Sequence, residues 1–103
     1  MVLEQCGYHV LQANSGAEGL RLLRSERVHV AIIDFWLPDM DGAELVREIR
    51  RQFPEVRIAL LTGSTEYLDP KELKVDVVLS KPILPEALQE IVRELLQRGS
   101  AAA

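Results

Sequence analysis

The sequence predicts a doubly wound α/β fold, in which helices cover both faces of a parallel sheet. Two observations lead to this prediction. Short apolar segments alternate along the 103-residue chain with segments whose apolar residues recur at helical spacing. The apolar segments are also continuous, as they are in strands buried on both faces. Strands joined by helices run parallel with right-handed crossovers, and we expect about four of them in this chain.

Four apolar segments are the predicted strands, and each is bounded by residues that favour turns or helix ends. They are Tyr8–Ala13, Val28–Asp34, Val56–Leu61 and Val75–Leu79. The residues before the first strand, Met1–Gly7, are predicted as the last turns of a helix. We expect a single domain over residues 1–99 and a tail over residues 100–103.

The helices between these strands are predicted from their N-terminal signals. The signals are Ser15 with Glu18, Asp41 with Glu44, and Asp69 with Pro70. The last of these three helices should be short, because little chain remains before the next strand. The final helix begins at Pro85 and is expected to stop at Gly99. Asp39 and Asp41 are interpreted as turn and cap residues rather than metal ligands.

The composition argues against several classes of function. The formal net charge is −4 and both signs are mixed along the chain, so no basic surface for nucleic acid is expected. No apolar segment approaches the roughly 20 residues of a membrane helix, and the N-terminus does not resemble a signal peptide. Cys6 is the one cysteine, which rules out an internal disulfide and favours a reducing cytoplasm.

Three of the predicted strands end in side chains that suit phosphate chemistry. The second strand ends in the carboxylate of Asp34, the third is followed by Thr62, and the fourth leads to Lys81-Pro82. The carboxyl ends of parallel strands form one edge of the sheet, where α/β proteins bind their ligands. We therefore expect Asp34, Thr62 and Lys81 to lie together. A carboxylate in this position can attack phosphorus and form an aspartyl phosphate.

The sequence resembles the receiver domain of bacterial two-component response regulators over Tyr8–Gln97. The segments that carry the resemblance are Ile33–Gly42, Leu60–Ser64 and Leu79–Pro82. The resemblance implies a flavodoxin-like fold with the strand order 2-1-3-4-5. It also implies that a histidine kinase donates a phosphoryl group, and that an output domain or protein lies on a separate chain.

The resemblance also assigns roles to single residues. Asp34 matches the phosphoacceptor of the family, and Thr62 and Lys81 match the residues that bind the phosphoryl oxygens. Thr62 and Val78 match the two positions of the family's switch. The family also uses Mg²⁺, for which Asp34 and the backbone carbonyl of Trp36 match two ligands. The expected function is signalling in the cytoplasm rather than that of an enzyme.

The sequence departs from the family pattern at its start. The family's first strand, with the acidic pair that holds Mg²⁺, has no counterpart here. We therefore expect weak or absent Mg²⁺ binding and a site that is phosphorylated poorly or not at all. That strand is central in the family's order, so its neighbours would leave buried backbone groups unpaired, at roughly 1–3 kcal/mol each. Tyr8–Ala13 could close against Val28–Asp34, pair with a second chain or hang free; we expect closure or intermolecular pairing, and hence a homo-oligomer.

Two functions stay open on this sequence. Asp34, Thr62 and Lys81 favour a phosphoacceptor receiver. The missing acidic pair, and Val78 where the family usually has an aromatic residue, favour a protein-binding module that keeps the scaffold and acts without phosphorylation. A phosphatase is disfavoured, because Trp36 stands where its second carboxylate would be.

Overall fold

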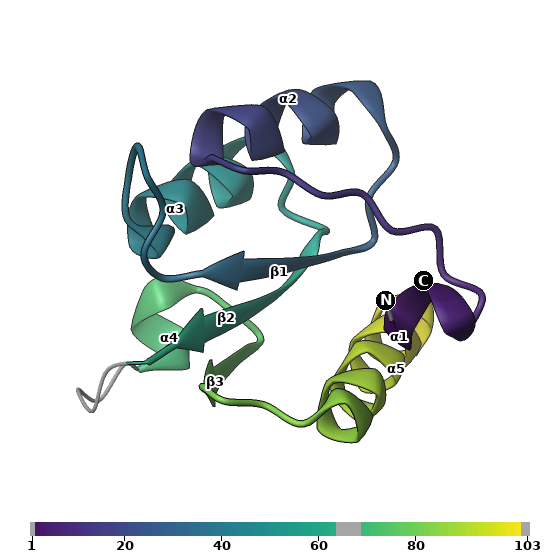
Figure 1. Ribbon diagram of the computed structural model, residues 1–103. Helices are drawn as coiled ribbons and strands as arrows, with labels where there is room; N and C mark the ends of the chain where they lie inside the picture. Colours follow the sequence, from purple (N-terminus) through teal and green to yellow (C-terminus); the bar gives the residue numbers. More distant parts are fainter. Residues whose placement is uncertain (1, 64–68, 102–103) are drawn as a thin grey trace.

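The computed structural model describes residues 2–63 and 69–101. After an N-terminal helical turn, helices and strands alternate along the chain. The elements are α1 (Val2–Gln5), α2 (Gly16–Ser25), β1 (Val30–Asp34), α3 (Gly42–Gln52), β2 (Arg57–Thr62), α4 (Pro70–Leu73), β3 (Val77–Ser80) and α5 (Pro85–Ala101). Figure 1 shows α2 and α3 on one side of the sheet and α5 on the other. This order and layering confirm the predicted α/β fold.

The sheet places the ends of its strands at one edge. Within the described residues it has three parallel strands in the order β1-β2-β3. Asp34 lies opposite Leu61, and Thr62 lies opposite Ser80. The loops that follow β1, β2 and β3 therefore all begin at the carboxyl edge of the sheet, where the sequence predicts the site.

The predicted strand at Tyr8–Ala13 is absent, so the expectation of about four strands is wrong. These residues pair with no strand in the described part of the chain and run as a coil between α1 and α2 (Figure 1). A strand needs a partner for its backbone hydrogen bonds, and this segment pairs with none of the described strands. Leu11 is 38% exposed as a result. The expected closure of Tyr8–Ala13 against β1 does not occur.

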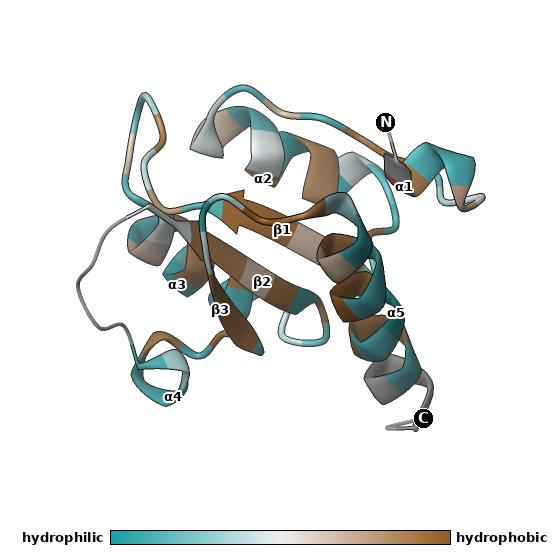
Figure 2. Ribbon diagram, turned by 60° about the horizontal axis from the view of Figure 1, so that its bottom comes forward, coloured by the Kyte–Doolittle hydropathy of each residue, from teal (hydrophilic) through white to brown (hydrophobic). Residues whose placement is uncertain are grey.

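The main core lies between the sheet and the helices α2 and α3. Val46 and Ile49 of α3 meet Ile58 and Leu60 of β2, and none of the four is more than 1% exposed. Figure 2 shows the apolar strands between helices whose outer faces are hydrophilic. The cap at Ser15, whose Oγ accepts the Glu18 N–H at 3.1 Å, confirms the predicted start of α2.

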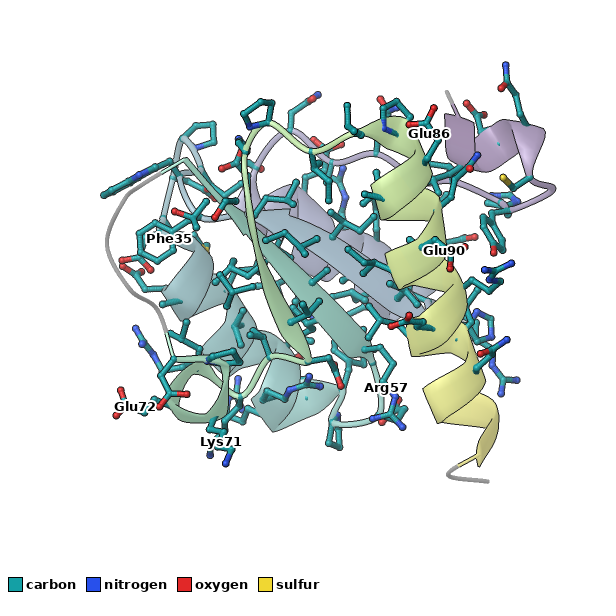
Figure 3. All side chains as sticks on the ribbon, turned by 90° about the horizontal axis from the view of Figure 1, so that it is seen from below. Phe35, Arg57, Lys71, Glu72, Glu86 and Glu90 are labelled. Carbon is teal, nitrogen blue, oxygen red and sulfur yellow. The ribbon has the colours of Figure 1, made fainter. Side chains whose placement is uncertain are left out.

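The long helix α5 covers the other face of the sheet and carries α1. Val92 and Leu95 of α5 are buried, as is Leu3 of α1, and the Gln89 side chain donates to Cys6 Sγ at 3.1 Å. Figure 3 labels Glu86 and Glu90 on α5, and both side chains are exposed. No helix in the ranges 2–63 and 69–101 is long and apolar enough to cross a membrane.

The predicted end of the last helix is wrong. Helix α5 continues through Gly99 to Ala101. Glycine inside a helix costs only about 1 kcal/mol relative to alanine, and the residue that ends α5 is itself alanine, the best helix former.

An ionic contact fixes the start of β3 and thereby the strand that leads to Lys81. Asp76 Oδ2 accepts the Ile58 N–H at 2.8 Å and lies 3.3 Å from Arg50 Nη2. The Arg50 guanidinium also donates to the carbonyl oxygens of Lys74 and Pro54. Arg50 thus joins α3 to the chain on both sides of β2 and to the segment before β3.

Candidate functional site

Asp34 and Lys81 form an ion pair at the carboxyl edge of the sheet. Lys81 Nζ contacts Asp34 Oδ2, and the side chains are 41% and 39% exposed, respectively. The two residues are 47 positions apart in the chain, so only the parallel strands bring them together. The expected proximity of Asp34 and Lys81 is confirmed. A half-exposed carboxylate beside an ammonium group can meet a ligand from solvent.

Backbone hydrogen bonds continue the ladder just beyond the strands and position this pair. Phe35 N–H donates to the Leu61 carbonyl at 2.8 Å, directly after Asp34. Lys81 N–H donates to the Thr62 carbonyl at 2.8 Å. The Lys81-Pro82 peptide bond is cis. The backbones that carry the carboxylate and the ammonium group are therefore both tied to β2.

Thr62 ends β2 between the two charged residues. It is 3% exposed and follows Ile58 and Leu60 in the alternation of side chains, so it lies on the α3 side of the sheet. The Thr62 carbonyl thus holds the Lys81 backbone. The Thr62 side chain, which carries the hydroxyl, is buried at the carboxyl edge of the sheet. The role of that hydroxyl stays a prediction.

Val78, the predicted switch position, lies inside β3. It is opposite Leu60, is half-buried and packs against the main core. A β-branched side chain held in a strand has few χ1 alternatives. The structure gives this position packing, and any role in switching stays a prediction.

The loop after Asp34 is a tight turn closed on itself. Trp36 and Asp41 form an antiparallel bridge, and Leu37 N–H donates to the Met40 carbonyl at 3.2 Å. Trp36 N–H donates to Asp34 Oδ1 at 3.2 Å, and its side chain is 70% exposed. The Trp36 and Phe35 rings pack perpendicular to each other with centroids 5.0 Å apart, and Figure 3 labels Phe35 at this end of the sheet. The turn therefore delivers one backbone N–H to the phosphoacceptor candidate.

The two other acidic residues of this turn cap two different helices. Asp41 accepts the Glu44 N–H at 2.9 Å at the start of α3, which confirms it as a cap. Asp39 accepts the Gly16 N–H at 2.9 Å and the Ala17 N–H at 3.0 Å, at the start of α2. These two hydrogen bonds lower the pKa of Asp39. The sequence indicates a turn at Asp39, but no local pattern signals a contact with residues more than 20 positions away.

The two expected Mg²⁺ ligands, Asp34 and the Trp36 carbonyl, lie at the end of β1 and in the turn that follows it. Mg²⁺ takes near-octahedral oxygen ligands. Nowhere in ranges 2–63 and 69–101 do three or more His, Cys, Asp or Glu residues gather as metal ligands. Of the two Asp34 oxygens, one contacts Lys81 and the other accepts the Trp36 N–H. Both Asp34 oxygens are thus already engaged, and the weak or absent Mg²⁺ binding stays a prediction.

A family model and individual relatives match this chain in sequence. The family model for the response regulator receiver domain matches residues 1–93. The alkaline phosphatase synthesis transcriptional regulatory protein PhoP of Bacillus subtilis is 33% identical over 104 residues, which cover 98% of this chain and 43% of that protein. The transcriptional regulatory protein AfsQ1 of Streptomyces coelicolor is 36% identical over 100 residues, which cover 94% of this chain and 44% of that protein.

Solved structures match as well. A response regulator receiver domain protein from Methanospirillum hungatei superposes with a TM-score of 0.90 at 29% identity, over 99% of this chain and 84% of that one. The chain spans less than half the length of the curated relatives named above. The order of elements, the placement of Asp34 and Lys81 and these matches lead to one conclusion: the chain belongs to the family of response regulator receiver domains.

Proposed function

We propose that the chain accepts a phosphoryl group on Asp34 from a histidine kinase in a two-component phosphorelay. The ion pair between Asp34 and Lys81 at the carboxyl edge of the sheet is the observation that carries this proposal. Family membership supports it, because response regulator receiver domains belong to two-component signalling. The chain then acts as a phosphoacceptor in signalling and not as a turnover enzyme. Its proposed partners are a cytoplasmic histidine kinase and an output domain or protein on a separate chain.

In the proposed reaction, a carboxylate oxygen of Asp34 attacks the phosphorus of a phosphohistidine. A P–O bond to Asp34 forms as the P–N bond breaks, and the departing imidazole keeps the electron pair and takes up a proton. The Lys81 ammonium group turns from the carboxylate to a phosphoryl oxygen, and the Thr62 hydroxyl donates to another. These groups act by offsetting charge and by positioning, which is how proteins catalyse most phosphoryl transfer.

The reaction is proposed to be slow in this chain. A metal ion normally stabilises the charge that develops on the phosphoryl oxygens, and the described residues contain no group of three or more His, Cys, Asp or Glu that could hold one. Lys81 is then the main positive charge at the site. Poor phosphorylation is the expected outcome.

A phosphodonor of low molecular weight tests this function. Acetyl phosphate should modify the chain slowly, and hydroxylamine should release the label, because an aspartyl phosphate is an acyl phosphate. A phosphoserine or phosphothreonine would survive hydroxylamine. Label that survives this treatment would contradict Asp34 as the acceptor.

A second candidate function is a protein-binding module that needs no phosphorylation. The observation that favours it is the same ion pair, in which Lys81 already neutralises Asp34, together with Val78 packed in the core. If this function holds, a folded chain takes up no label from acetyl phosphate at any Mg²⁺ concentration. The phosphorylation assay therefore separates the two functions.

We also propose self-association through the outer edge of β1. The His29 carbonyl accepts the Arg57 N–H at 3.0 Å and the Phe35 N–H donates to Leu61, so odd-numbered residues of this segment pair with β2. Val30, Ile32 and Asp34 therefore direct their backbone groups to the opposite edge. Two copies related by a two-fold axis can pair these edges antiparallel about Ile32.

A further inference from the structure

We propose that Asp39 is a positioning residue for the phosphoacceptor, because it ties the turn that follows Asp34 to the start of α2. This inference rests on the proposed function of Asp34. Asp39 does not touch Asp34 in any described contact, so its effect would pass through the turn. Along the chain, β1 separates the turn Phe35–Asp41 from the helix α2.

The tie consists of two hydrogen bonds from one carboxylate. Asp39 Oδ1 accepts the Gly16 N–H at 2.9 Å and Oδ2 accepts the Ala17 N–H at 3.0 Å. The first N–H groups of a helix have no partner within the helix and attract negative charge. Using both oxygens fixes the orientation of the carboxylate as well as its distance, which a single hydrogen bond would not do.

Close packing supports the tie at the same place. Gly16 is buried against the Met40 side chain, and a Cβ at position 16 would stand 2.5 Å from Met40 Sδ. The turn thus lies directly on the backbone of α2, and glycine makes this approach possible. Asp39 and Met40, two neighbours in the turn, are therefore both held by the first residues of one helix.

The turn is closed in a way that carries this restraint to Asp34. The Trp36–Asp41 bridge and the Leu37–Met40 hydrogen bond join its two sides. Trp36 then donates its N–H to Asp34 Oδ1 at 3.2 Å. A turn released from α2 would loosen the one described backbone contact to this oxygen, and with it the orientation of the attacking carboxylate.

Ser15 supplies a matched control. It caps the same helix through Glu18, at 3.1 Å, but it makes no described contact with the turn. Ser15→Ala therefore weakens the start of α2 and leaves the tie in place, whereas Asp39→Ala removes the tie. Asp39→Asn keeps an oxygen acceptor without the charge and serves as the conservative variant, also if Asp39→Ala fails to fold.

Trp36 is the one tryptophan of the chain and reports on the turn without any phosphorylation. We expect Asp39→Ala to lower the fluorescence anisotropy of Trp36 and to raise its quenching by acrylamide, with Asp39→Asn between it and the wild type. Ser15→Ala should match the wild type. An unchanged anisotropy in Asp39→Ala, or an equal change in Ser15→Ala, would overturn the proposal.

The second measurement is the rate at which acetyl phosphate modifies Asp34. Small displacements of a reacting group lower the reaction rate strongly. We therefore expect Asp34 to be modified about tenfold more slowly in Asp39→Ala than in Ser15→Ala, and Asp39→Asn to recover part of the rate. Equal rates in the two alanine variants would overturn the positioning role. If the wild type takes up no label, the proposed function of Asp34 fails, while the Trp36 measurement still decides whether Asp39 holds the turn.

Discussion

Lys81, directly after β3, reaches across the carboxyl edge of the sheet to contact Asp34 at the end of β1, although β2 lies between these two strands. Both side chains are substantially exposed, and exposed ion pairs contribute at most about 1 kcal/mol to stability. The pair is therefore better explained by chemistry at the site than by stability of the fold.

Replacing Lys81 should separate these two explanations. We expect Lys81→Ala to keep the urea midpoint of the wild type within error, yet to slow modification of Asp34 on the order of 100-fold, the cost of removing one preorganised charge-stabilising group. Arg93→Ala, which removes an exposed partner of Glu90 on α5, is the control and should change neither quantity. A large loss of stability in Lys81→Ala with an unchanged rate would show that the ion pair serves the fold.

Gly42 allows the turn and α3 to meet, and its replacement should be damaging. A Cβ at position 42 would lie 2.8 Å from Phe35 Cα and 3.0 Å from the Asp34 carbonyl oxygen, both of which are backbone atoms. We expect Gly42→Ala to destabilise the fold by about 1–3 kcal/mol through overpacking. Gly19→Ala is the matched control, since its nearest neighbour is a side-chain atom at 3.8 Å, and a helical glycine replaced by alanine should gain up to about 1 kcal/mol. Urea unfolding of both variants measures the difference, and a neutral Gly42→Ala would contradict the close approach.

The Asp39 tie should make stability depend on pH in a defined direction. Hydrogen bonds from Gly16 and then from Ala17 lower the pKa of Asp39 from its ordinary value of 3.8. The pKa of Asp39 is thus lower in the folded than in the unfolded protein. The contribution of Asp39 to stability is therefore complete above the unfolded pKa and is lost as the pH falls through the folded pKa.

The comparison that isolates this effect is between the wild type and Asp39→Asn. The difference between their urea midpoints should shrink as the pH is lowered from about 6 towards 2, because Asp39 becomes protonated in the wild type. The other carboxylates titrate in both proteins, so their effects cancel in the difference. The difference between the wild type and Ser15→Ala should stay constant over the same range. A difference for Asp39→Asn that does not change with pH would contradict the tie.

The proposed pairing of β1 edges can be tested with a single proline. Ile32→Pro removes an N–H that points away from β2, and edge strands tolerate proline at such positions. We expect analytical ultracentrifugation to find a dimer for the wild type and for Ile32→Ala, and a folded monomer for Ile32→Pro. A monomeric wild type, or a dimer that survives Ile32→Pro, would contradict pairing through this edge.

The sequence predicts best what depends on neighbouring residues. The caps at Ser15 and Asp41 follow from side chains that bond backbone groups three positions ahead, and the structure contains both. The meeting of Asp34 and Lys81 is not local, but it follows from parallel strands, whose ends share an edge.

The features that the sequence does not predict depend on distant partners. Tyr8–Ala13 has the apolar composition of a strand, yet composition does not decide whether a segment pairs with a neighbour, and this one pairs with no described strand. The tie between Asp39 and Gly16 spans 23 positions and involves a backbone N–H, which any residue except proline has. The sequence also does not predict the end of α5. A glycine is only a weak signal for the end of a helix, and α5 continues through Gly99 to Ala101.

Asp34 is the proposed phosphoacceptor, and an intact-mass spectrum after incubation with acetyl phosphate and Mg²⁺ measures its modification most directly. We expect a slow, incomplete gain of one phosphoryl group in the wild type and none in Asp34→Ala. A gain of the same size in Asp34→Ala, or no gain in a wild type shown to be folded by circular dichroism, would contradict this proposal.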